Sequence, residues 1–413
     1  MGSINRFAGV SIVACGIAAA ACDSDETTGG TGGTGGTAGA GAGVVGGGGT
    51  GGSTSTSSGG GSGGGVVSGD YEGFGTITQG HESCPEAFTE VHVTSLDDAG
   101  AGTLREALTD GCRLILFDLG GTIVLQDDLN IRYSYITIDG ASAPAPGITI
   151  EQPGDIGTTI EARASTGPAH DIIIHHLRLD GMATDHTNAG DIWGLDGMDA
   201  PVSAVIIDHV TGVAATDGVF DIYGDVKDVT LSYNLIIDTA YALHVSTADI
   251  SQSRERISFH HNVFSGNNER QIRLRHNNQL IDFVNNVVHG WGWWDGVGYG
   301  LYVNHDSGET NTSVNVVANV FHNAASTTSD DQLAIRFDHG ADEGTIYFEG
   351  NIVPSGESDN VSNGAALDIP SFAQVTRFAA DSLATNVVPN VGTHHPTSAE
   401  QSLLQEIAAA IAP

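Results

Sequence analysis

Most of the chain shows short runs in which hydrophobic residues alternate with polar ones, separated by glycine-rich or polar turns. The alternation has the two-residue period of β-strands and begins after Arg113. The first strands are expected at LILF (114–117), TIVL (122–125), YITI (135–138) and ITI (148–150). The pattern therefore predicts an all-β domain.

Helical periodicity is confined to two places. A short helix or helical turn is expected within GTLREALT (102–109), ahead of the first strands. The segment SAEQSLLQEIAAAIA (398–412) has apolar residues at helical spacing, and Ser398 with Gln401 would form a capping box at its start. The domain should thus end in a short helix.

The later strands form a repeat. Seven apolar runs, spaced by about 24 to 33 residues, align as IIIHHL, VIIDHV, VTLSYN, ISFHHN, IDFVNN, VNVVAN and IYFEGN. Five of them end in asparagine, at Asn234, Asn262, Asn286, Asn319 and Asn351. A strand followed by Asn at a bend fits a solenoid with coils about 4.8 Å apart and a hydrogen-bonded ladder of Asn amides. The prediction is a right-handed, single-stranded parallel β-helix.

A β-sandwich or a β-propeller is the competing fold. Both need hairpins, but two-residue hairpin turns are missing between successive runs, and an Asn ladder has no role in either fold. The unequal spacing of the strands favours insertions that build a cleft on one face of a solenoid.

The first 69 residues differ from the rest in composition. Residues 1–22 combine Arg6 with a short apolar run that ends at Cys22, which predicts a secretory signal. Cys22 follows alanines and precedes acidic residues, as in bacterial lipoproteins, so its lipidation would anchor the chain to a membrane; an ordinary signal peptide is the alternative. Residues 23–69 are rich in Gly, Ser and Thr and should form a disordered linker. The folded domain is expected at 70–413, secreted or at the cell surface or outer membrane of a bacterium.

The chain is strongly acidic, with a formal net charge of −36, which argues against nucleic acid as a partner. An acidic polysaccharide is not excluded, because a bound cation and clustered arginines act locally while distant charge is screened by salt. Cys84 and Cys112 could form a disulfide in an oxidising compartment. It would close a loop of 28 residues and stabilise the fold by about 3–4 kcal/mol.

Carboxylates recur near the start of two adjacent repeats. Asp217 and Asp221 lie four residues apart, on one face of a strand, and Asp196 lies one coil earlier, with Asp199 as an alternative to it. Carboxylates from adjacent coils suit Ca²⁺, which accepts irregular oxygen cages. The alternative is that these residues only populate glycine-rich turns.

Three arginines follow within six residues, at Arg270, Arg273 and Arg275, in a chain that is short of positive charge. Guanidinium groups bind carboxylates in bidentate fashion, so a clamp for the carboxylates of a substrate is one interpretation and solvated ion pairs are the other. Arg273 and Arg275 would share one face of a strand.

Aromatic residues allow two further interpretations. Paired positions recur at His175/His176, Asp208/His209 and His260/His261, which favours a structural stack over a zinc site. The cluster at Trp291, Trp293 and Trp294 could stack on sugars, although Trp291 directly after a strand fits the core equally well.

The ordered set TLREAL, GGTIVL, YITIDGAS, IIIHHLRL, VIIDH, DGVFD, VTLSYN, ISFHHNVF and FVNNVVHGW, from about Leu104 to Trp291, resembles the pectate lyases of the first polysaccharide lyase family. The resemblance implies a parallel β-helix and Ca²⁺-dependent β-elimination of polygalacturonate, with pectate or pectin as the polysaccharide. A monomer is expected.

By position, the resemblance makes Asp196, Asp217 and Asp221 the calcium ligands. It makes Arg270 the base that removes the C5 proton and Arg275 the residue that holds the substrate beside it. Calcium on the uronate carboxylate would acidify the neighbouring C–H bond and stabilise the carbanion-like intermediate.

The chain departs from the family pattern at three places. Ile272 replaces the usual proline, while Tyr223 and Tyr241 stand where substrate-binding lysines are common. Lys227 is the only lysine of the chain and matches neither position. Weaker binding of fully ionised pectate is expected, so partly methyl-esterified pectin or another uronan is an alternative substrate.

Two other functions remain open on the same scaffold. One is a β-helix that binds carbohydrate without catalysis, and the other is a hydrolase with carboxylates about 6.5–9.5 Å apart for inversion.

Overall fold

The computed structural model describes residues 71–152, 160–163, 167–182, 191–215, 217–249, 251–292, 298–304, 312–323, 333–337, 345–353 and 364–413. The signal, Cys22 and the linker predicted for residues 1–69 lie outside these ranges, as do Trp293 and Trp294. The chain divides into a unit Met1–Ser62 and a unit Gly63–Pro413, and everything described here belongs to the second.

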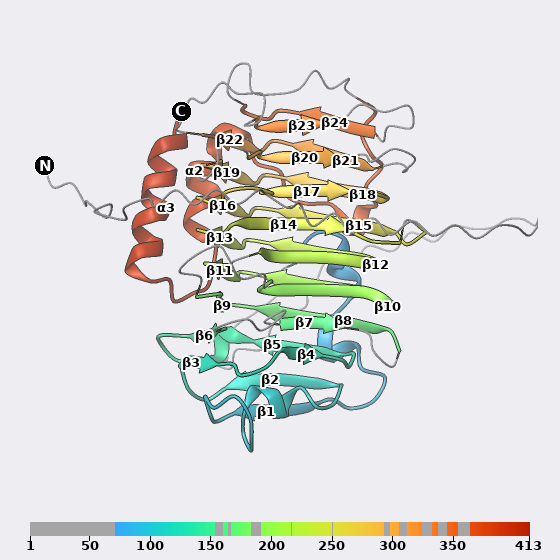
Figure 1. Cartoon of the computed structure of the whole chain (residues 1–413), viewed down its shortest axis with the longest axis vertical. Coiled ribbons are helices and arrows are strands. Elements are labelled where there is room, and N and C mark those ends of the chain that lie inside the picture. The colour runs from blue at the N-terminus through green and yellow to red at the C-terminus, as the bar shows by residue number, and fades with distance from the viewer. Residues whose placement is uncertain are drawn as a thin grey trace, which may run out of the picture. The chain divides into compact units, whose positions relative to one another are not determined.

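The strands are stacked in three parallel columns, each with one strand per coil (Figure 1). Column 1 is formed by β1 (Thr89–Val93), β2 (Arg113–Phe117), β5 (Ile136–Asp139), β8 (Ala169–His175), the second halves of β10 (Trp193–Asp208) and β12 (Gly218–Ser232), β15 (Arg254–His260), β18 (Asn278–Val284), β21 (Ser313–Val317) and β24 (Thr345–Glu349). Column 2 is formed by β4 (Leu129–Ile131), β7 (Ile160–Arg163), the first halves of β10 and β12, β14 (Tyr241–Ser246), β17 (Ile272–Arg275), β20 (Leu301–Asn304) and β23 (Ile335–Phe337). Column 3 is formed by β3 (Gly121–Val124), β6 (Ile148–Glu151), β9 (Leu177–Asp180), β11 (Thr211–Val213), β13 (Leu235–Ile237), β16 (Val263–Ser265), β19 (Val287–His289) and β22 (Val320–His322).

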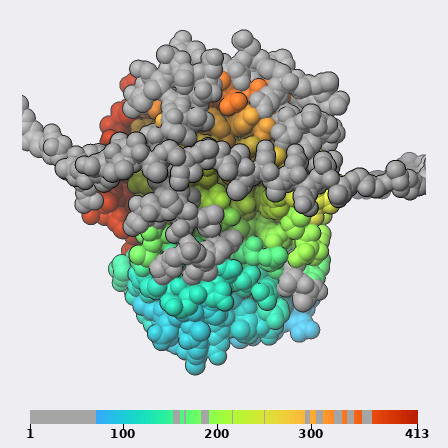
Figure 2. All heavy atoms as spheres, in the orientation of Figure 1, coloured from blue at the N-terminus to red at the C-terminus, as the bar shows by residue number. Residues whose placement is uncertain are grey.

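This arrangement is the predicted parallel β-helix. In Figure 2 the surface follows the same order as the coils, from the cyan first coils to the orange last ones. Alternate side chains of each strand point inward, and residues such as Phe220, Leu243 and Ile272 fill one continuous core. Trp291 is only 2% exposed and belongs to this core, which decides between the two interpretations of that residue.

Strands β10 and β12 pass through the corner between columns 2 and 1. The first half of β10 pairs with β7 and the second half with β8. Gly197 of β10 lies opposite Gly224 of β12 at this corner, and a Cβ on Gly224 (φ +83°) would lie 2.4 Å from the carbonyl carbon of Gly197. Glycine is therefore required where two bent strands approach so closely.

The predicted asparagine ladder runs between columns 1 and 3. Each Asn Nδ2 donates to the Oδ1 of the Asn one coil further on, with distances of 3.0, 2.9, 3.2 and 2.9 Å along Asn234, Asn262, Asn286, Asn319 and Asn351. The same Oδ1 atoms accept the backbone N–H groups at the bend, as in Asn262 Oδ1 with Asn234 N at 2.9 Å. The ladder therefore satisfies the polar groups of a turn that is buried.

A second stack, which we call the ring stack, lies one residue before the ladder. It contains His176, His209, Tyr233 and His261, all with φ between 51° and 57°. Tyr233 stacks on His209 with centroids 5.0 Å apart and on His261 at 4.7 Å. Three of the recurring histidines, His176, His209 and His261, thus belong to the predicted stack at the turn.

The helices lie outside the coils. They are α1 (Leu104–Ala107), α2 (Leu383–Asn386) and α3 (Ser398–Ile411), with the 3₁₀ helices η1 (Phe74–Ile77), η2 (Gly80–Ser83), η3 (Gly140–Ser142), η4 (Ser371–Ala373), η5 (Ala380–Ser382) and η6 (Val388–Asn390). Helices α2 and α3 pack on the outer face of column 3 (Figure 1) and bury apolar residues from β11 to β22. Among the described residues, no helix combines the length and the hydrophobicity that crossing a membrane would require.

The capping box of α3 is one residue earlier than predicted. Thr397, not Ser398, is the N-cap: its Oγ1 accepts from Glu400 N at 3.2 Å, and the Glu400 carboxylate accepts from Thr397 N at 2.7 Å. The Ser398/Gln401 box is therefore wrong. Glu400 also accepts from Arg178 Nε at 2.9 Å, so tertiary contact with β9 decides between two local patterns that both satisfy the rule.

Cys84 and Cys112 form a disulfide with Cα atoms 5.5 Å apart. It links the segment after η2 to the start of β2 and closes a loop of 28 residues. Cross-linking a loop of this length stabilises a fold by about 3–4 kcal/mol in the loop-entropy picture.

Candidate active site

Column 2 carries a line of polar side chains across four neighbouring coils, which we call the polar row. Asp221 of β12 lies opposite His244 of β14, His244 opposite Arg273 of β17, and Arg273 opposite Tyr302 of β20. Their neighbours in each strand belong to the core, so these side chains point outward. Parallel in-register stacking therefore places an acid, an imidazole, a guanidinium and a phenol side by side.

A cavity of about 150 Å³ lies at the acidic end of the polar row. Four carboxylates line it, together with Gly194 and Leu195 of β10 and the ring of Tyr223: these are Glu161, Asp191, Asp196 and Asp221. They come from β7, β10, β12 and the residues just before β10. Their oxygens form the kind of donor set that hard cations prefer.

Asp191 is a site residue that the sequence analysis missed. It precedes β10 by two residues, and its Oδ1 accepts from Gly218 N at 2.8 Å. Burial raises its pKa well above the usual value, and the nearby charges of Asp221 and Asp217 raise it further. The pairing of Trp193 with Phe220 fixes this register, and aligning these two aromatic residues would have revealed Asp191.

Asp221 is the best-placed of the predicted ligands. Its Oδ1 is buried and has no hydrogen-bond partner among the described residues, and His244 Nδ1 lies 3.4 Å away. Burial raises the pKa of Asp221 to about 7, and repulsion from Asp217 contributes. The charge of Arg270 opposes this rise, and a cation bound beside Asp221 would favour its ionised form further.

The other predicted ligands lie around these two. Asp196 lines the same cavity, but its Oδ2 is 3.4 Å from Arg163 Nε and its Oδ1 accepts from a backbone N–H. Asp199 is exposed, and its Oδ2 lies 3.5 Å from Arg163 Nη2. Asp217 does not line the cavity and lies 3.8 Å from Arg270 Nη1. The structure thus gathers Asp196, Asp217 and Asp221 in one region, with Asp191 inserted among them.

Arg270 sits just before β17 at the edge of this region. Its backbone is left-handed (φ 50°), and its Cζ lies 4.0 Å from the centroid of the Tyr241 ring. Its buried Nε makes no hydrogen bond to the described part of the chain. The phenol ring and Asp217 hold the guanidinium in place from two sides. Tyr241, which stands where a lysine was expected, is therefore a support for Arg270.

Arg273 and Arg275 point outward from β17 as predicted. Arg273 Nη2 donates to Asn304 Oδ1 at 2.6 Å, and its Cζ lies 5.6 Å from the centroid of the Tyr302 ring. Arg336 of β23 lies over the same ring at 4.7 Å. Arg275 is near enough to Tyr223 to lower that phenol's pKa, against the larger effect of burial, which raises it.

His244 occupies the centre of the polar row and was not singled out from the sequence. Burial lowers its pKa well below the usual value, and the charges of Arg270, Arg273 and Arg275 lower it further. It is therefore a neutral imidazole at physiological pH. Its Nε2 is buried and has no hydrogen-bond partner among the described residues.

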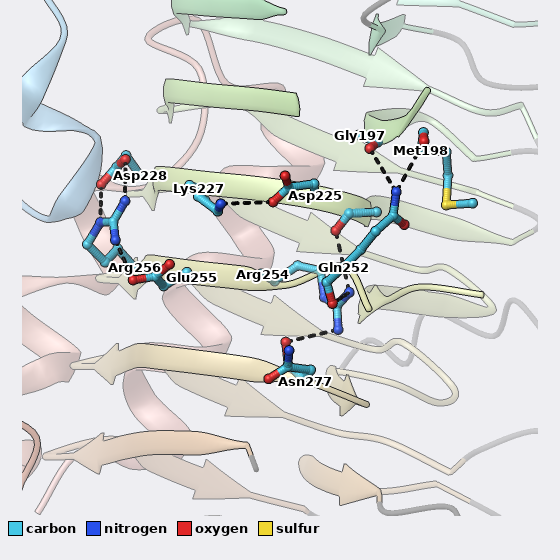
Figure 3. Close-up of polar contacts among 11 residues, drawn as sticks. Gly197, Met198, Asp225, Lys227, Asp228, Gln252, Arg254, Glu255, Arg256 and Asn277 are labelled. Atoms are coloured by element: carbon cyan, nitrogen blue, oxygen red, sulfur yellow. Dashed lines mark hydrogen bonds and ion pairs between the residues drawn. The ribbon is translucent and has the colours of Figure 1, made fainter. Parts of the chain in front are cut away.

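The single lysine does not line the cavity. Lys227 Nζ pairs with Asp225 Oδ1 at 3.2 Å in the second half of β12, beyond the glycine corner (Figure 3). Near it, the fully buried Arg254 donates to Asn277 O at 3.0 Å. The site's cations are therefore arginines alone among the described residues.

Comparison with known proteins agrees with this architecture. A probable pectate lyase C of Aspergillus flavus is 30% identical over 302 residues, covering 73% of this chain and 63% of that protein. A probable pectate lyase C of Aspergillus oryzae is 30% identical over 280 residues, covering 68% and 59%. The chain thus spans about six tenths of the length of these curated relatives. No family model matches the sequence.

Solved structures show the same fold. The crystal structure of jun a 1, the major allergen from cedar pollen, matches with a TM-score of 0.59 at 18% identity, over 78% of this chain and 92% of that one. A pectate lyase from Bacillus sp. N165 in complex with trigalacturonate matches with a TM-score of 0.51 at 19% identity, over 78% and 98%. With the sequence relatives and the parallel β-helix both in agreement, the chain belongs to the pectate lyase family.

Proposed function

We propose that the protein is a polysaccharide lyase that cleaves α-1,4-linked galacturonan by β-elimination. The observation that carries the proposal is the juxtaposition of a carboxylate-lined cavity with Arg270 and the two outward-facing arginines of β17, Arg273 and Arg275, on one column of the β-helix. The relatives are probable pectate lyases, and one solved structure of the same fold holds trigalacturonate. An anionic polymer lying along column 2 would meet positive side chains and a cation site together.

The cavity fits a calcium ion. Glu161, Asp191, Asp196 and Asp221 offer oxygen ligands only, and calcium binds oxygen ligands in irregular geometry. Two observations indicate that the protein's own neighbours do not balance the negative charge of this cluster. The pKa values of Asp191 and Asp221 are raised, and Asp221 Oδ1 lacks a hydrogen bond among the described residues. Asp217, at the edge of the cavity, is the remaining predicted ligand. Bound calcium would polarise a uronate carboxylate and so acidify the adjacent C5–H bond.

The arginines would position the uronate and receive its proton. Arg275 and Arg273 would hold carboxylates of the polymer through charge-assisted hydrogen bonds. A nitrogen of Arg270 would take the C5 proton and the electron pair of that C–H bond would form the C4–C5 double bond. The bond from C4 to the glycosidic oxygen would break, and the leaving oxygen would take a proton from solvent water. Tyr241 would keep the guanidinium plane fixed through this step.

A guanidinium normally stays protonated, so its use as a base needs a special setting. Asp217 Oδ1 lies 3.8 Å from Arg270 Nη1 and at the edge of the carboxylate-lined cavity. A cation that engaged Asp217 would compete with Arg270 for this carboxylate. The proximity of Asp217 to both the acidic cluster and Arg270 supports such coupling.

The tyrosines at positions 223 and 241 favour a less charged polymer than fully ionised pectate. Tyr223 lines the cavity and Tyr241 supports Arg270, so neither provides a cation to the substrate. Partly methyl-esterified pectin, or another uronan, is the substrate expected to compete with pectate.

We also propose that the enzyme is secreted and tethered through Cys22. The Cys22 pattern is a bacterial one, whereas both relatives named above are fungal.

The test is an assay of the purified protein on pectate, methyl-esterified pectin and other uronans, with calcium and with a chelator. The ultraviolet absorbance of an unsaturated product that appears only with calcium is the expected result. Saturated reducing ends formed in the presence of chelator would indicate a hydrolase instead. Binding of oligogalacturonide without any product would indicate a non-catalytic carbohydrate-binding β-helix.

A further inference from the structure

Three side chains of the kinds that bind metal ions, Glu72, His260 and His261, meet at the end of β15. The glycine corner lies at the other end of the column 1 strands. Glu72 comes from the segment just before η1, whereas His260 and His261 close β15 and begin the turn. One ligand atom from each residue lies within 4.8 Å of the others. Residues separated by almost two hundred positions thus converge on one point, and none of them belongs to the carboxylate cavity.

The two imidazole rings are perpendicular, and their Nδ1 atoms lie 2.8 Å apart. Two nitrogens bound to one tetrahedral zinc ion at about 2.0–2.1 Å lie about 3.3 Å apart, so the pair would open by about 0.5 Å to hold an ion. His260 Nε2 lies 3.3 Å from the carbonyl oxygen of Glu72. Donation to that carbonyl leaves the lone pair of His260 on Nδ1, which is how ligating histidines are held in the correct tautomer.

The histidines are rigidly placed. His261 belongs to the ring stack, with Tyr233 stacked at 4.7 Å and Phe378 edge-on at 5.4 Å. Neither His260 nor His261 is more than 1% exposed. The ring contacts and the burial together fix where both imidazoles lie.

The third ligand is held by the C-terminal segment. The carboxylate of Glu72 accepts from Thr376 N at 2.7 Å and from Thr376 Oγ1. The nearby carboxylate of Asp208 adds negative charge that a dication would balance.

We propose that Glu72, His260 and His261 bind one divalent transition-metal ion, for which Zn²⁺ is the reference, with water at the remaining position. Two imidazoles and one carboxylate form a donor set that zinc accepts and that calcium and magnesium disfavour. The ion would fasten the segment before η1 and the Thr376 segment to the end of β15. This site is independent of the proposed lyase activity.

The test is a zinc titration of the full, metal-stripped chain by calorimetry, in excess calcium so that the carboxylate cavity is filled. One zinc ion per chain and a rise in melting temperature are expected. Glu72→Gln keeps an oxygen for Thr376 but removes the charge, and should weaken zinc binding by about tenfold or more. Glu82→Gln, an exposed glutamate on η2, is the matched control and should bind as the wild type does.

His261→Asn removes an imidazole and introduces a residue that tolerates the left-handed backbone. Asn285, the equivalent residue one coil later, has φ 54°. It should lose zinc binding, whereas His209→Asn in the same ring stack should keep it. If either ligand variant fails to fold, Co²⁺ bound to the wild type should give the visible bands of a four- or five-coordinate nitrogen site. Failure of the wild type to bind zinc, or equal binding by Glu72→Gln, would overturn the proposal.

Discussion

The asparagine ladder and the polar row are built by the same device, a side chain repeated at one register position of successive coils, but they differ in how they are satisfied. In the ladder, Asn262 accepts from Asn234 and donates to Asn286 and to a backbone carbonyl. In the polar row, buried atoms of Asp221, His244 and Arg273 lack hydrogen bonds among the described residues. Identical residues in register stabilise the turn, while different residues in register leave groups available for a ligand.

The difference shows how a solenoid separates stability from chemistry. The ladder lies at the bend between columns 1 and 3, and the polar row lies on the outer face of column 2. Because the strands of column 2 are held by their backbone pairing and by inward-facing residues, their outward side chains can be changed without removing a core contact. Unsatisfied and repelling groups are then tolerated at the site.

The sharpest test of this separation is Arg270→Ala. Loss of the proposed base should lower kcat by about 10²- to 10⁴-fold while the melting temperature stays close to that of the wild type. Arg256→Ala, which removes the partner of Asp228 on the adjacent column (Figure 3), is the control and should leave kcat unchanged. Normal turnover by Arg270→Ala on pectate and on pectin would remove Arg270 from the mechanism.

Asp221→Asn tests the acidic end of the polar row. It should abolish most calcium-dependent activity, and calorimetry should show at least tenfold weaker calcium binding, because a buried charged ligand is lost. A chelator should lower the activity of the wild type to a similar extent. Unaltered calcium affinity in this variant would place the ion elsewhere.

The same variant has a signature in the pH dependence of stability. The folded pKa of Asp221 is about 7, above its usual value of 3.8, so protonation favours the folded state. This stabilisation is complete at low pH and is lost as the pH rises through about 7. Without calcium, the melting temperature of Asp221→Asn relative to the wild type should therefore increase between about pH 4 and pH 8. A difference independent of pH would contradict the raised pKa.

Asn262→Ala tests the other region. It removes the acceptor of Asn234 N and Nδ2 and leaves buried groups without partners, so the free energy of unfolding should fall by about 2–4 kcal/mol. Asn351→Ala, at the end of the ladder, should cost about half as much, because Asn351 is partly exposed. Denaturant titration measures both, and kcat below the transition should not change. A larger effect on kcat than on stability would mean that the two regions are coupled.

Tyr241→Ala is expected to have the smallest effect. Removing the ring from beneath Arg270 forfeits a cation–π contact of about 1 kcal/mol, or about fivefold in kcat/KM. Tyr241→Phe keeps the ring and should remain close to the wild type. If the phenylalanine variant lost as much as the alanine variant, the hydroxyl rather than the ring would matter.

The sequence was most informative where one physical rule repeats. Alternating apolar residues and the recurring Asn predicted the β-helix and the ladder because each coil obeys the same burial and hydrogen-bonding constraints. The arginines of β17 were found because they are rare in this chain. Asp191 and His244 were missed because their importance depends on which coil lies beside them, and that register is set by pairs such as Trp193 with Phe220.

Local rules failed where a distant contact decides between two equal patterns. Thr397 with Glu400 and Ser398 with Gln401 both read as capping boxes, and only the contact of Glu400 with Arg178 distinguishes them. From its own strand alone, Asp196 was likewise a plausible metal ligand. In the structure, Arg163 Nε from the preceding coil lies 3.4 Å from Asp196 Oδ2. Neither partner is visible from local sequence.

The outer segments that lie along the stack bear on how the domain unfolds. A solenoid whose coils contact only their neighbours can fray from either end, one coil at a time. Here α2 and α3 bury Val213, Leu235, Val263, Val287 and Val320, one from each of five successive coils. Phe74 N and Gly75 N likewise donate to Ser258 and Thr230 on adjacent coils. These contacts run across the coils and join the middle coils into a single cooperative unit. Unfolding of that unit should therefore be all-or-none rather than stepwise.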